Sequence, residues 1–559
     1  MSNVTSRGSK VIILEVDLSS GKVEKRDLGW DMRAKYIGGR GVNAKLLYDN
    51  VTPEIDAYSP GNLVLFGTGP MAGTGAAFST RMSTLTKSNY CVYGHSDIGG
   101  YFAPELRRAG YDHIVVKGKA DQPVYIWIDD DEVEIRSAVR LWGKGVRETD
   151  RLIKEELGDP GVRVAAIGQA GENLVRYADV VIVPERAGGS RGMGAAMGSK
   201  KLKAIAVRGT GHIGVANEEL VRKMAKDFIA RVKERPFCDS RTQWSGSHMM
   251  NSLRNIGAAP IKNLTTKTGE ELNEATREAM AQYYTARSSG CPGCPVRHWP
   301  SWEINEGPYA GEHGWGLEGG VSYPYVYNVL NSNLPSVFVA NSLLNDYGMD
   351  ASESSTIIAA AMEWFEKGIV TKEDLDGMEL KWGDHEAIIK LIHKIARREG
   401  IGDLLAEGCV RAAEKIGKGA KDCISYGKGR TSGILDWRTL KGSYLNEVTS
   451  SPPCEMMDGM SGIECYDFLL PRTPEVEAAV KEKFGTVDVL NALSYNKAGA
   501  VVYYQDLSMV LDILEFCLFA SEWTAEACTI KDMADQFQAV TGIDMGVDDL
   551  IKAARRVRA

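Results

Sequence analysis

Two cysteines and a histidine lie close together in the middle of the chain, in the segment SGCPGCPVRH. Cys291 and Cys294 have the Cys-x2-Cys spacing with which two thiolates reach one metal centre, and His298 follows as a possible third ligand. The spacing alone does not distinguish a metal centre from a redox-active pair or two buried thiols. A fourth ligand would have to come from elsewhere in the chain. The remaining cysteines are Cys91, Cys238, Cys409, Cys423, Cys454, Cys465, Cys517 and Cys528.

A glycine-rich segment with two arginines, RAGGSRGMGAAMGSK, begins at Arg186. Backbone N–H groups in such turns form a concavity for an anion, and the guanidinium groups of Arg186 and Arg191 can bind phosphate through paired hydrogen bonds. The alternative is a glycine-rich turn that packs closely on a helix. A second cluster, Gly67-Thr-Gly69-Pro70, lacks the spacing of a dinucleotide-binding loop.

A third segment, NEGPYAGEHGWGLE at residues 305–318, places acidic groups and a histidine on a Gly- and Pro-rich loop. Glu312 and His313 are candidates for acid–base work in a cavity. The alternative is a solvated surface loop. The aromatic neighbours Tyr309 and Trp315 are less typical of plain surface.

Residues 1–208 predict a β-rich scaffold for these segments. Residues 11–17 and 23–26 flank Ser-Ser-Gly, a hairpin signal, and residues 124–128 and 132–135 flank an acidic turn. Further strands are expected at residues 63–66, 113–116, 162–167, 179–183 and 204–207.

From about residue 217 the apolar spacing changes to that of helices, and Asn217 is a predicted N-cap for a helix over 218–235. Other helices are predicted at residues 336–346, 352–367, 385–398, 401–416, 475–484, 506–520 and 548–557. We therefore predict an α+β protein in three domains. A β-rich domain (1–208) is followed by a helical domain with the cysteine motif (209–416) and a C-terminal helical domain (417–559).

Composition and charge exclude several classes of protein. The 66 Lys and Arg against 74 Asp and Glu give a net charge of −8, which argues against a general nucleic-acid binder. No apolar stretch reaches ~18 residues without a charge, and no export signal is visible. We expect a cytoplasmic protein without a membrane span, whose 10 cysteines are thiols or metal ligands rather than disulfides.

Together these pieces resemble the tungsten-dependent aldehyde:ferredoxin oxidoreductase family, essentially from end to end. The resemblance is carried, in this order, by ILEVDLSSGKV, GGRGVNAKLLYD, GTGPMAGTGA…STR, GGYFAPELRRAGYDHIVVKGKA, VRVAAIGQAGEN and RGMGAAMGSKKLKAIAVRG. It implies that the N-terminal domain binds a tungstopterin.

The resemblance also implies a set of cofactors. One tungsten, or in some members molybdenum, is held by two molybdopterins, with a [4Fe–4S] cluster beside one pterin and Mg²⁺ bridging the pterin phosphates. Arg81 matches the arginine that links the cluster to the pterin. The first pterin's phosphate and the bridging cation match Asp97, Gly99, Gly100, Arg186, Ala187, Gly188 and Arg191.

Two further motifs match the second pterin and the cluster. The family's Asp-x2-Gly-Leu-Asp block reads Asn345-Asp-Tyr-Gly-Met349-Asp350 here. Its Asp-x4-Cys block begins at Asp512 and ends at Cys517, which the resemblance makes the distant cluster ligand. Aspartates suit the amide and amino edge of a pterin as hydrogen-bond acceptors.

This chain departs from the family at the cluster, where the third cysteine of the motif is His298. A neutral imidazole in place of a thiolate removes one negative charge, so the cluster should be easier to reduce. The alternative is that His298 only forms a hydrogen bond near the cluster.

A second departure concerns the active site. Aldehyde-oxidising members carry a glutamate in a GPEYET-like loop and a histidine in a later loop. Here the first loop reads GPYAGEHGWG, which puts Glu312 or His313 in place of the acid–base group. The later loop has no histidine, and Cys454 is a candidate on the substrate side. Relatives of the class II benzoyl-CoA reductase type have a tungsten-ligating cysteine in the first loop, which this chain lacks.

The resemblance therefore predicts an oxidoreductase that converts an aldehyde to a carboxylic acid, or the reverse. Electrons would pass through the cluster to ferredoxin or an iron–sulfur partner subunit. The alternative is a low-potential reductase subunit acting on an aromatic or other acyl-CoA thioester. A third hypothesis is a cofactor-binding or assembly subunit, against which the intact arginine, aspartate and glycine blocks argue. We expect a small carbonyl substrate, no nucleic acid, and a homo- or hetero-oligomer.

Overall fold

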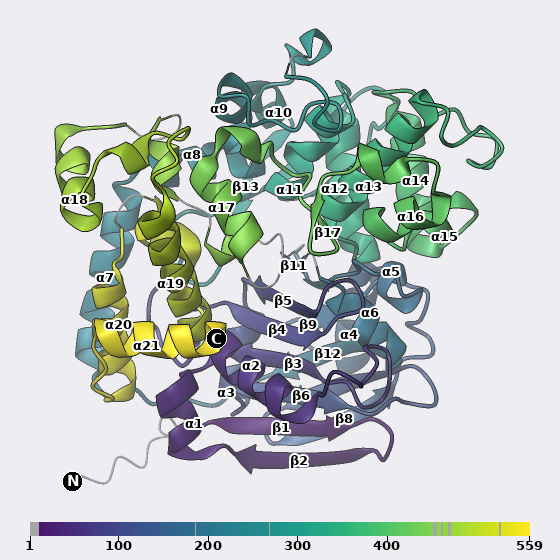
Figure 1. Ribbon diagram of the computed structural model, residues 1–559. Coiled ribbons are helices and arrows are strands. Elements are labelled where there is room, and N and C mark those ends of the chain that lie inside the picture. Colours follow the sequence, from purple (N-terminus) through teal and green to yellow (C-terminus); the bar gives the residue numbers. More distant parts are fainter. Residues whose placement is uncertain are drawn as a thin grey trace.

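The computed structural model describes residues 10–559 except 185, 190, 268, 451–455, 460–461, 468–470 and 525–526. Figure 1 shows the β-rich N-terminal part below a larger helical part. This arrangement confirms the predicted α+β class.

The first sheet has six strands in the order β2-β1-β6-β3-β4-β5. Only β1 and β6 pair in parallel; the other neighbours are antiparallel. The predicted first hairpin is confirmed, with Val16 opposite Val23. The strands are β1 (Ile12–Asp17), β2 (Lys22–Asp27), β3 (Val64–Thr68), β4 (Met82–Lys87), β5 (Tyr93–Ile98) and β6 (His113–Lys117).

The second sheet also has six strands, in the order β11-β10-β9-β12-β7-β8, and the predicted hairpin of β7 and β8 is confirmed. Its strands are β7 (Val124–Asp129), β8 (Glu132–Ser137), β9 (Arg163–Ala166), β10 (Val180–Ile182), β11 (Arg186–Gly188) and β12 (Leu202–Arg208). One apolar core joins the sheets, because Leu14 and Phe66 of the first share it with Ile126 and Ile205 of the second.

Six helices belong to this sheet region. They are α1 (Gly29–Tyr36), α2 (Gly39–Asn50), α3 (Phe102–Arg108), α4 (Val146–Leu157), α5 (Gln169–Glu172) and α6 (Met193–Ser199). Val42 and Leu46 of α2 pack on the first sheet, and Val146 and Ile153 of α4 pack on the second. The core helices α3 and α6 add Phe102 and Met197 to the apolar layer between the sheets.

Two separate apolar cores hold the helical part together. The first is built around α9 (Met250–Asn255), α10 (Arg277–Ala281), α11 (Gly319–Ser322), α12 (Leu334–Tyr347), α13 (Ala351–Glu366), α14 (His385–Arg397), α15 (Ile401–Leu405) and α16 (Cys409–Ile416). Beside it lie a three-stranded sheet, β13 (Tyr284–Ser289), β14 (Trp299–Glu303) and β15 (His313–Trp315), and the short pair β16 (Tyr426–Gly427) and β17 (Arg430–Thr431).

The second core contains helices from both ends of the helical part: α7 (Glu218–Lys233), α8 (Pro236–Trp244), α18 (Pro474–Phe484), α19 (Ala498–Leu514), α20 (Ile530–Thr541) and α21 (Val547–Arg558). Figure 1 shows α7 beside α20, while α17 (Lys441–Thr449) lies between the two helical groups. Conversely, Leu435 and Trp437 belong to the first core. Each of the two cores therefore contains residues from both sides of residue 417.

Two helix ends can be compared with the sequence predictions. The predicted cap is confirmed, since the Asn217 side chain accepts a hydrogen bond from the Leu220 N–H at 3.0 Å. The helix predicted over 506–520 instead spans Ala498–Leu514 and ends where Glu515 adopts a left-handed conformation with φ 53°. Cys517 therefore lies on the segment after the helix. No helix within the described ranges is long and apolar enough to cross a membrane.

Candidate functional site

Two cavities share a wall where the sheets meet the helical cores. The first, of about 310 Å³, is lined by Arg191, Asp350 and Asp512 among others, and we call it the groove. The second, of about 350 Å³, is lined by Cys291, Cys294 and Cys517 among others, and we call it the thiol cavity. The residues that line both are Arg81, Asp97, Ala187, Glu318, Gly320, Ile434, Met457 and Leu518.

The groove collects most residues predicted to bind cofactor, from segments far apart in the sequence. It is lined by Arg81, Asp97, Ala187, Arg191, Asn345, Met349, Asp350 and Asp512. Of the other predicted residues, Gly99 and Arg186 line the thiol cavity. Gly100 has φ +120°, and a Cβ there would lie 3.8 Å from Cγ of Arg186. Gly188 is the last residue of β11, which pairs with β10.

Asp350 is positioned by a helix start. Its side chain accepts a hydrogen bond from the Glu353 N–H at 2.6 Å and so caps α13. Its own N–H donates to the Tyr177 carbonyl at 3.0 Å, which ties this helix to the sheet region. A Cβ on Gly189 would come within 3.2 Å of Oδ2 of Asp350. Glycine therefore allows the backbone of the anion-binding segment to approach this carboxylate.

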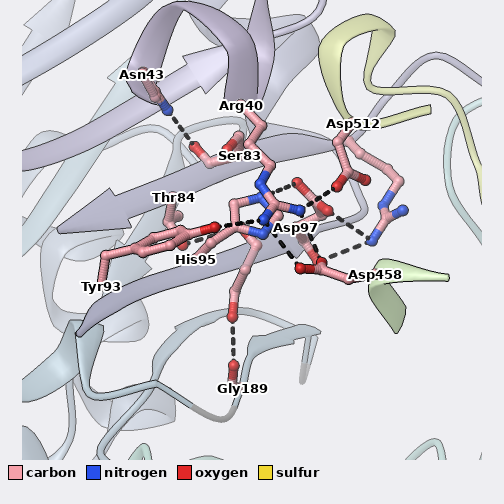
Figure 2. A network of polar contacts seen from close by, with 12 residues as sticks. Arg40, Asn43, Ser83, Thr84, Tyr93, His95, Asp97, Gly189, Asp458 and Asp512 are labelled. Atoms are coloured by element: carbon pink, nitrogen blue, oxygen red, sulfur yellow. Dashed lines mark hydrogen bonds and ion pairs between the residues drawn. The ribbon is translucent and has the colours of Figure 1, made fainter. Parts of the chain in front are cut away.

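Figure 2 shows a buried ionic network beside Asp512. Arg40, in α2, donates from Nη1 to Asp458 at 2.8 Å and to Asp512 at 2.9 Å, and from Nη2 to the Tyr93 hydroxyl at 2.9 Å. Burial acts to lower the pKa of Arg40, but Asp458, Tyr93 and Asp512 raise it well above its ordinary value. Burial and the nearby Asp97 raise the pKa of Asp512 to about 6, against the opposing charge of Arg40.

Arg40 is a site residue that our sequence analysis did not single out. It lies in the GGRG motif quoted for the resemblance, and that motif was the available signal. Only the tertiary fold brings Asp458 and Asp512 to it.

A second part of the network in Figure 2 involves Asp97 and His95 of β5. His95 Nε2 lies 3.1 Å from Oδ1 of Asp97, and Arg81 Nη2 lies 3.5 Å from Oδ2. Burial lowers the pKa of His95 well below its ordinary value, so the ring is neutral. His95, Asp458 and Asp512 offer ligand atoms within 4.8 Å of one another. Because Arg40 already binds both carboxylates, this group is an ion-pair network rather than a site open to a cation.

The thiol cavity brings three cysteines together. Cys291 and Cys294 form a tight turn, with the Cys294 N–H donating to the Cys291 carbonyl at 3.1 Å. Cys517 arrives from the segment after α19, where its N–H donates to the Phe78 carbonyl at 2.8 Å. Burial raises the pKa of the Cys294 thiol to about 12, and charges on Cys517 and Cys291 add to the effect. The three thiols thus line one cavity although they come from two distant segments of the chain.

The spacing of these ligands argues against a single zinc ion. Four sulfurs at ~2.3 Å from zinc in a tetrahedron lie about 3.8 Å apart. Among the described residues of the thiol cavity, no three Cys, His, Asp or Glu ligand atoms lie within 4.8 Å of one another. A cavity with wider spacing suits a cluster of several metal atoms.

His298 lies in the same cavity, with its ring edge-on to Trp299 and Phe519 at centroid distances of 5.5 and 5.7 Å. Its buried Nδ1 has no hydrogen-bond partner among the described residues. A donor atom is therefore available near the thiols.

The predicted acid–base residues are not in either cavity. Glu312 and His313 are exposed, because the turn before β15 directs them to solvent, where Nδ1 of His313 lies 3.2 Å from the Gly311 carbonyl. The candidate role passes to Glu318, which lines both cavities. Burial raises the pKa of Glu318, opposed by the charges of Arg186 and Arg241. Cys454 lies outside the described residues.

The sequence contained Glu318 within the same loop segment as Glu312 and His313, but loop composition could not indicate which acid faces inward. Its backbone N–H donates to Oδ1 of Asn341 at 3.1 Å, which fixes the loop against α12.

Comparisons with known proteins cover both the sheets and the helical cores. Residues 13–209 match the N-terminal domain of aldehyde ferredoxin oxidoreductase, and residues 223–559 match domains 2 and 3 of the same family. The tungsten-containing aldehyde ferredoxin oxidoreductase of Pyrococcus horikoshii is 35% identical over an alignment of 558 residues, which covers 98% of this chain and 86% of that protein.

Two other similarities involve different reactions. The WOR-like subunit of an aliphatic sulfonate oxidoreductase from Pyrococcus furiosus is 33% identical over 433 residues, covering 72% of this chain and 67% of that protein. Among solved structures, the active-site complex BamBC of benzoyl coenzyme A reductase, in complex with 1,5-dienoyl-CoA, has a TM-score of 0.83 at 28% identity. That match covers 99% of this chain and 88% of the other.

Proposed function

Because the chain belongs to the aldehyde ferredoxin oxidoreductase family, it is an oxidoreductase, and we propose that it interconverts an aldehyde and a carboxylic acid. Electrons would leave for ferredoxin or an iron–sulfur partner subunit in the cytoplasm. The observation that carries this proposal is the wall shared by the groove and the thiol cavity, where Glu318 faces both.

The groove suits a pair of molybdopterins that hold tungsten or molybdenum. Asp350 and Asp512 can accept hydrogen bonds from the N–H groups of two pterin rings. Arg81 and Arg191 can bind phosphate or a ring edge. We assign the Mg²⁺ that would bridge the phosphates to the region of Asp97, Gly99 and Gly100, on the resemblance alone.

The thiol cavity suits a [4Fe–4S] cluster. Cys291, Cys294 and Cys517 would supply three ligands, and we assign the fourth to His298 because its buried Nδ1 lacks a partner in the described part of the chain. When bound, the tungsten centre supplies two-electron chemistry at the carbonyl carbon, and the cluster carries electrons one at a time.

Glu318 would act as the general base. Its carboxylate has no hydrogen-bond partner among the described residues and faces the space between the thiols and the groove. There it can take a proton from the water that adds to the aldehyde carbon. A carboxyl whose pKa is raised by burial is a stronger base than a solvated one, which is the usual device for acid–base work near neutral pH. The buried apolar side chains of Leu435 and Leu440 line the same cavity as Glu318.

The test compares Glu318→Gln with Glu312→Gln, its exposed counterpart, in anaerobically purified holoenzyme. We expect Glu318→Gln to lower kcat by about 10²- to 10⁴-fold, with tungsten and iron per chain unchanged, and Glu312→Gln to leave kcat intact. Wild-type kcat/KM should fall as the pH drops through the raised pKa of Glu318, because protonation removes the base. Full activity of Glu318→Gln would overturn the assignment.

The structural similarity to the benzoyl coenzyme A reductase complex favours one alternative, the low-potential reduction of an acyl-CoA thioester. Turnover of aldehydes with an oxidised viologen, compared with turnover of aromatic acyl-CoA thioesters with a strong reductant, separates the two. Activity on thioesters alone would replace the aldehyde proposal.

A further inference from the structure

Two basic side chains that the mechanism above does not use line the thiol cavity. Arg241 of α8 and His248 of the adjoining 3₁₀ helix Ser245–Met249 both line it, and both are buried, with relative exposures of 7% and 3%. Neither is a thiol ligand or part of the predicted pterin site. The buried guanidinium of Arg241 needs a chemical reason, because burying a charge without an ion-pair partner is costly. His248 adds hydrogen-bonding capacity rather than charge, because burial lowers its pKa well below the ordinary value.

Arg241 is held in place without a carboxylate. Its Nη1 donates to the Ser245 carbonyl at 2.9 Å, and its guanidinium lies 4.5 Å above the centre of the Phe519 ring. Its Nε has no hydrogen-bond partner among the described residues, and no described acid forms an ion pair with it. The side chain is therefore rigid and retains unused donors.

His248 likewise retains an unused ring nitrogen. Its ring packs edge-on against Phe237 at 5.3 Å, and its buried Nδ1 has no partner within the described ranges. The other acids of the cavity are already engaged: Asp97 by Arg81, and Glu464 by Lys497 at 3.4 Å and by the Gly442 N–H at 2.8 Å. Of the described acids that line the cavity, Glu318 alone lacks a hydrogen bond to its carboxylate, and it is the proposed base.

We propose that Arg241 and His248 form an anion subsite, so that the substrate is a small aldehyde carrying a second, negatively charged group such as a carboxylate. Arginine binds a carboxylate through paired, charge-assisted hydrogen bonds, and a histidine N–H can add a third. Arg241 and His248 line the same cavity as Glu318, the proposed base. This proposal rests on the proposed function for the position of the reacting aldehyde, but the binding of the anion can be measured without turnover.

The binding test uses calorimetry on anaerobically purified holoenzyme with succinate and with succinamide, its uncharged four-carbon diamide. The wild type should bind succinate more tightly than succinamide by about 10- to 150-fold, the range expected for hydrogen bonds to a charged group. Arg241→Gln should abolish that preference, and His248→Gln should reduce it by about 2- to 13-fold. Arg277→Gln is the matched control, because Arg277 stacks 5.0 Å above Trp244 without lining the cavity and should keep the preference.

Two results would overturn the subsite. One is equal binding of succinate and succinamide by the wild type. The other is an Arg241→Gln variant that keeps the preference for succinate while the potential of its iron–sulfur signal shifts, which would assign the arginine to charge balance at the thiols. His248→Gln keeps the question answerable if Arg241→Gln does not fold.

A turnover measurement separates this proposal from the proposed function. The ratio of kcat/KM for 4-oxobutanoate and butanal should favour the anionic aldehyde in the wild type and fall towards one in Arg241→Gln. If both aldehydes are oxidised equally and succinate is not preferred, the subsite is wrong and aldehyde oxidation stands. If neither aldehyde reacts but succinate is still preferred, the subsite stands and the proposed reaction fails.

Discussion

Replacing Arg40 by glutamine should destabilise the protein through the two carboxylates that it leaves behind. The guanidinium lies 2.8 Å from Asp458 and 2.9 Å from Asp512, and the three side chains are at most 10% exposed. Removing one partner of a buried ion pair costs about 3–5 kcal/mol. With an unfolding entropy of ~2.1 cal/mol/K per residue, a chain of 559 residues has about 1.2 kcal/mol/K, so Tm should fall by about 3–4 °C.

The assay is differential scanning calorimetry at a fixed scan rate on cofactor-free protein. The control is Arg231→Gln, since Arg231 pairs with Asp532 at 3.0 Å with side chains 29% and 23% exposed. Such a pair is worth about 1 kcal/mol or less, a Tm change below about 1 °C. Adding Asp458→Asn to Arg40→Gln should recover part of the loss, because it removes one stranded charge. A Tm for Arg40→Gln no lower than that of Arg231→Gln would refute this reasoning.

Three other substitutions test the cofactor assignments. Cys517→Ser should abolish the iron–sulfur absorption while tungsten is retained. The control is Cys528→Ser, which changes a buried cysteine that does not line the thiol cavity and should keep both the cluster and tungsten. A cluster that survives in Cys517→Ser would exclude Cys517 as a ligand. His298→Cys should lower the midpoint potential in an EPR-monitored redox titration, because a thiolate restores negative charge; an unchanged potential would mean that His298 is no ligand. Asp350→Asn should keep the helix cap and change stability by less than about 1 kcal/mol, yet reduce the pterin phosphate released on denaturation; a full pterin content would remove Asp350 from the site.

The predictable strands are those whose pattern reflects one apolar face. Hairpins β1–β2 and β7–β8 were accessible in this way. Strands β4 (MSTLTK) and β5 (YGHSDI) were not predicted, although Ser83, Thr84 and His95 are buried. Several of their polar side chains form hydrogen bonds: the Thr84 hydroxyl donates to the Ser96 carbonyl at 3.1 Å, and the Ser96 hydroxyl donates to the Gly189 carbonyl (Figure 2). Hydropathy cannot reveal such strands, because the partners that make burial tolerable are distant in sequence.

The site residues also fall into two groups, those recognisable from local sequence and those that are not. Cys291 and Cys294 are recognisable from local spacing, whereas only a family motif brings Asp350, Asp512 and Cys517 into consideration. Their convergence depends on two helix ends, the cap of α13 and the stop of α19. Glu318 was missed because the sequence of a loop does not determine which of its acids faces the interior.

The shared wall explains why one arginine matters to both cavities. Arg81 contacts Asp97. Burial acts to lower the pKa of Arg81, but Asp97, Asp512 and Cys517 raise it above its ordinary value. Carboxylates of the groove and a thiol of the thiol cavity therefore act on one cation. A fixed positive charge between two electron carriers stabilises whichever side holds the extra electron. Because the Arg81 side chain is only 21% exposed, water screens this effect in part. An electron that moves from the groove to the thiols would therefore remain near the same cation, which reduces the electrostatic cost of separating it from the site of oxidation.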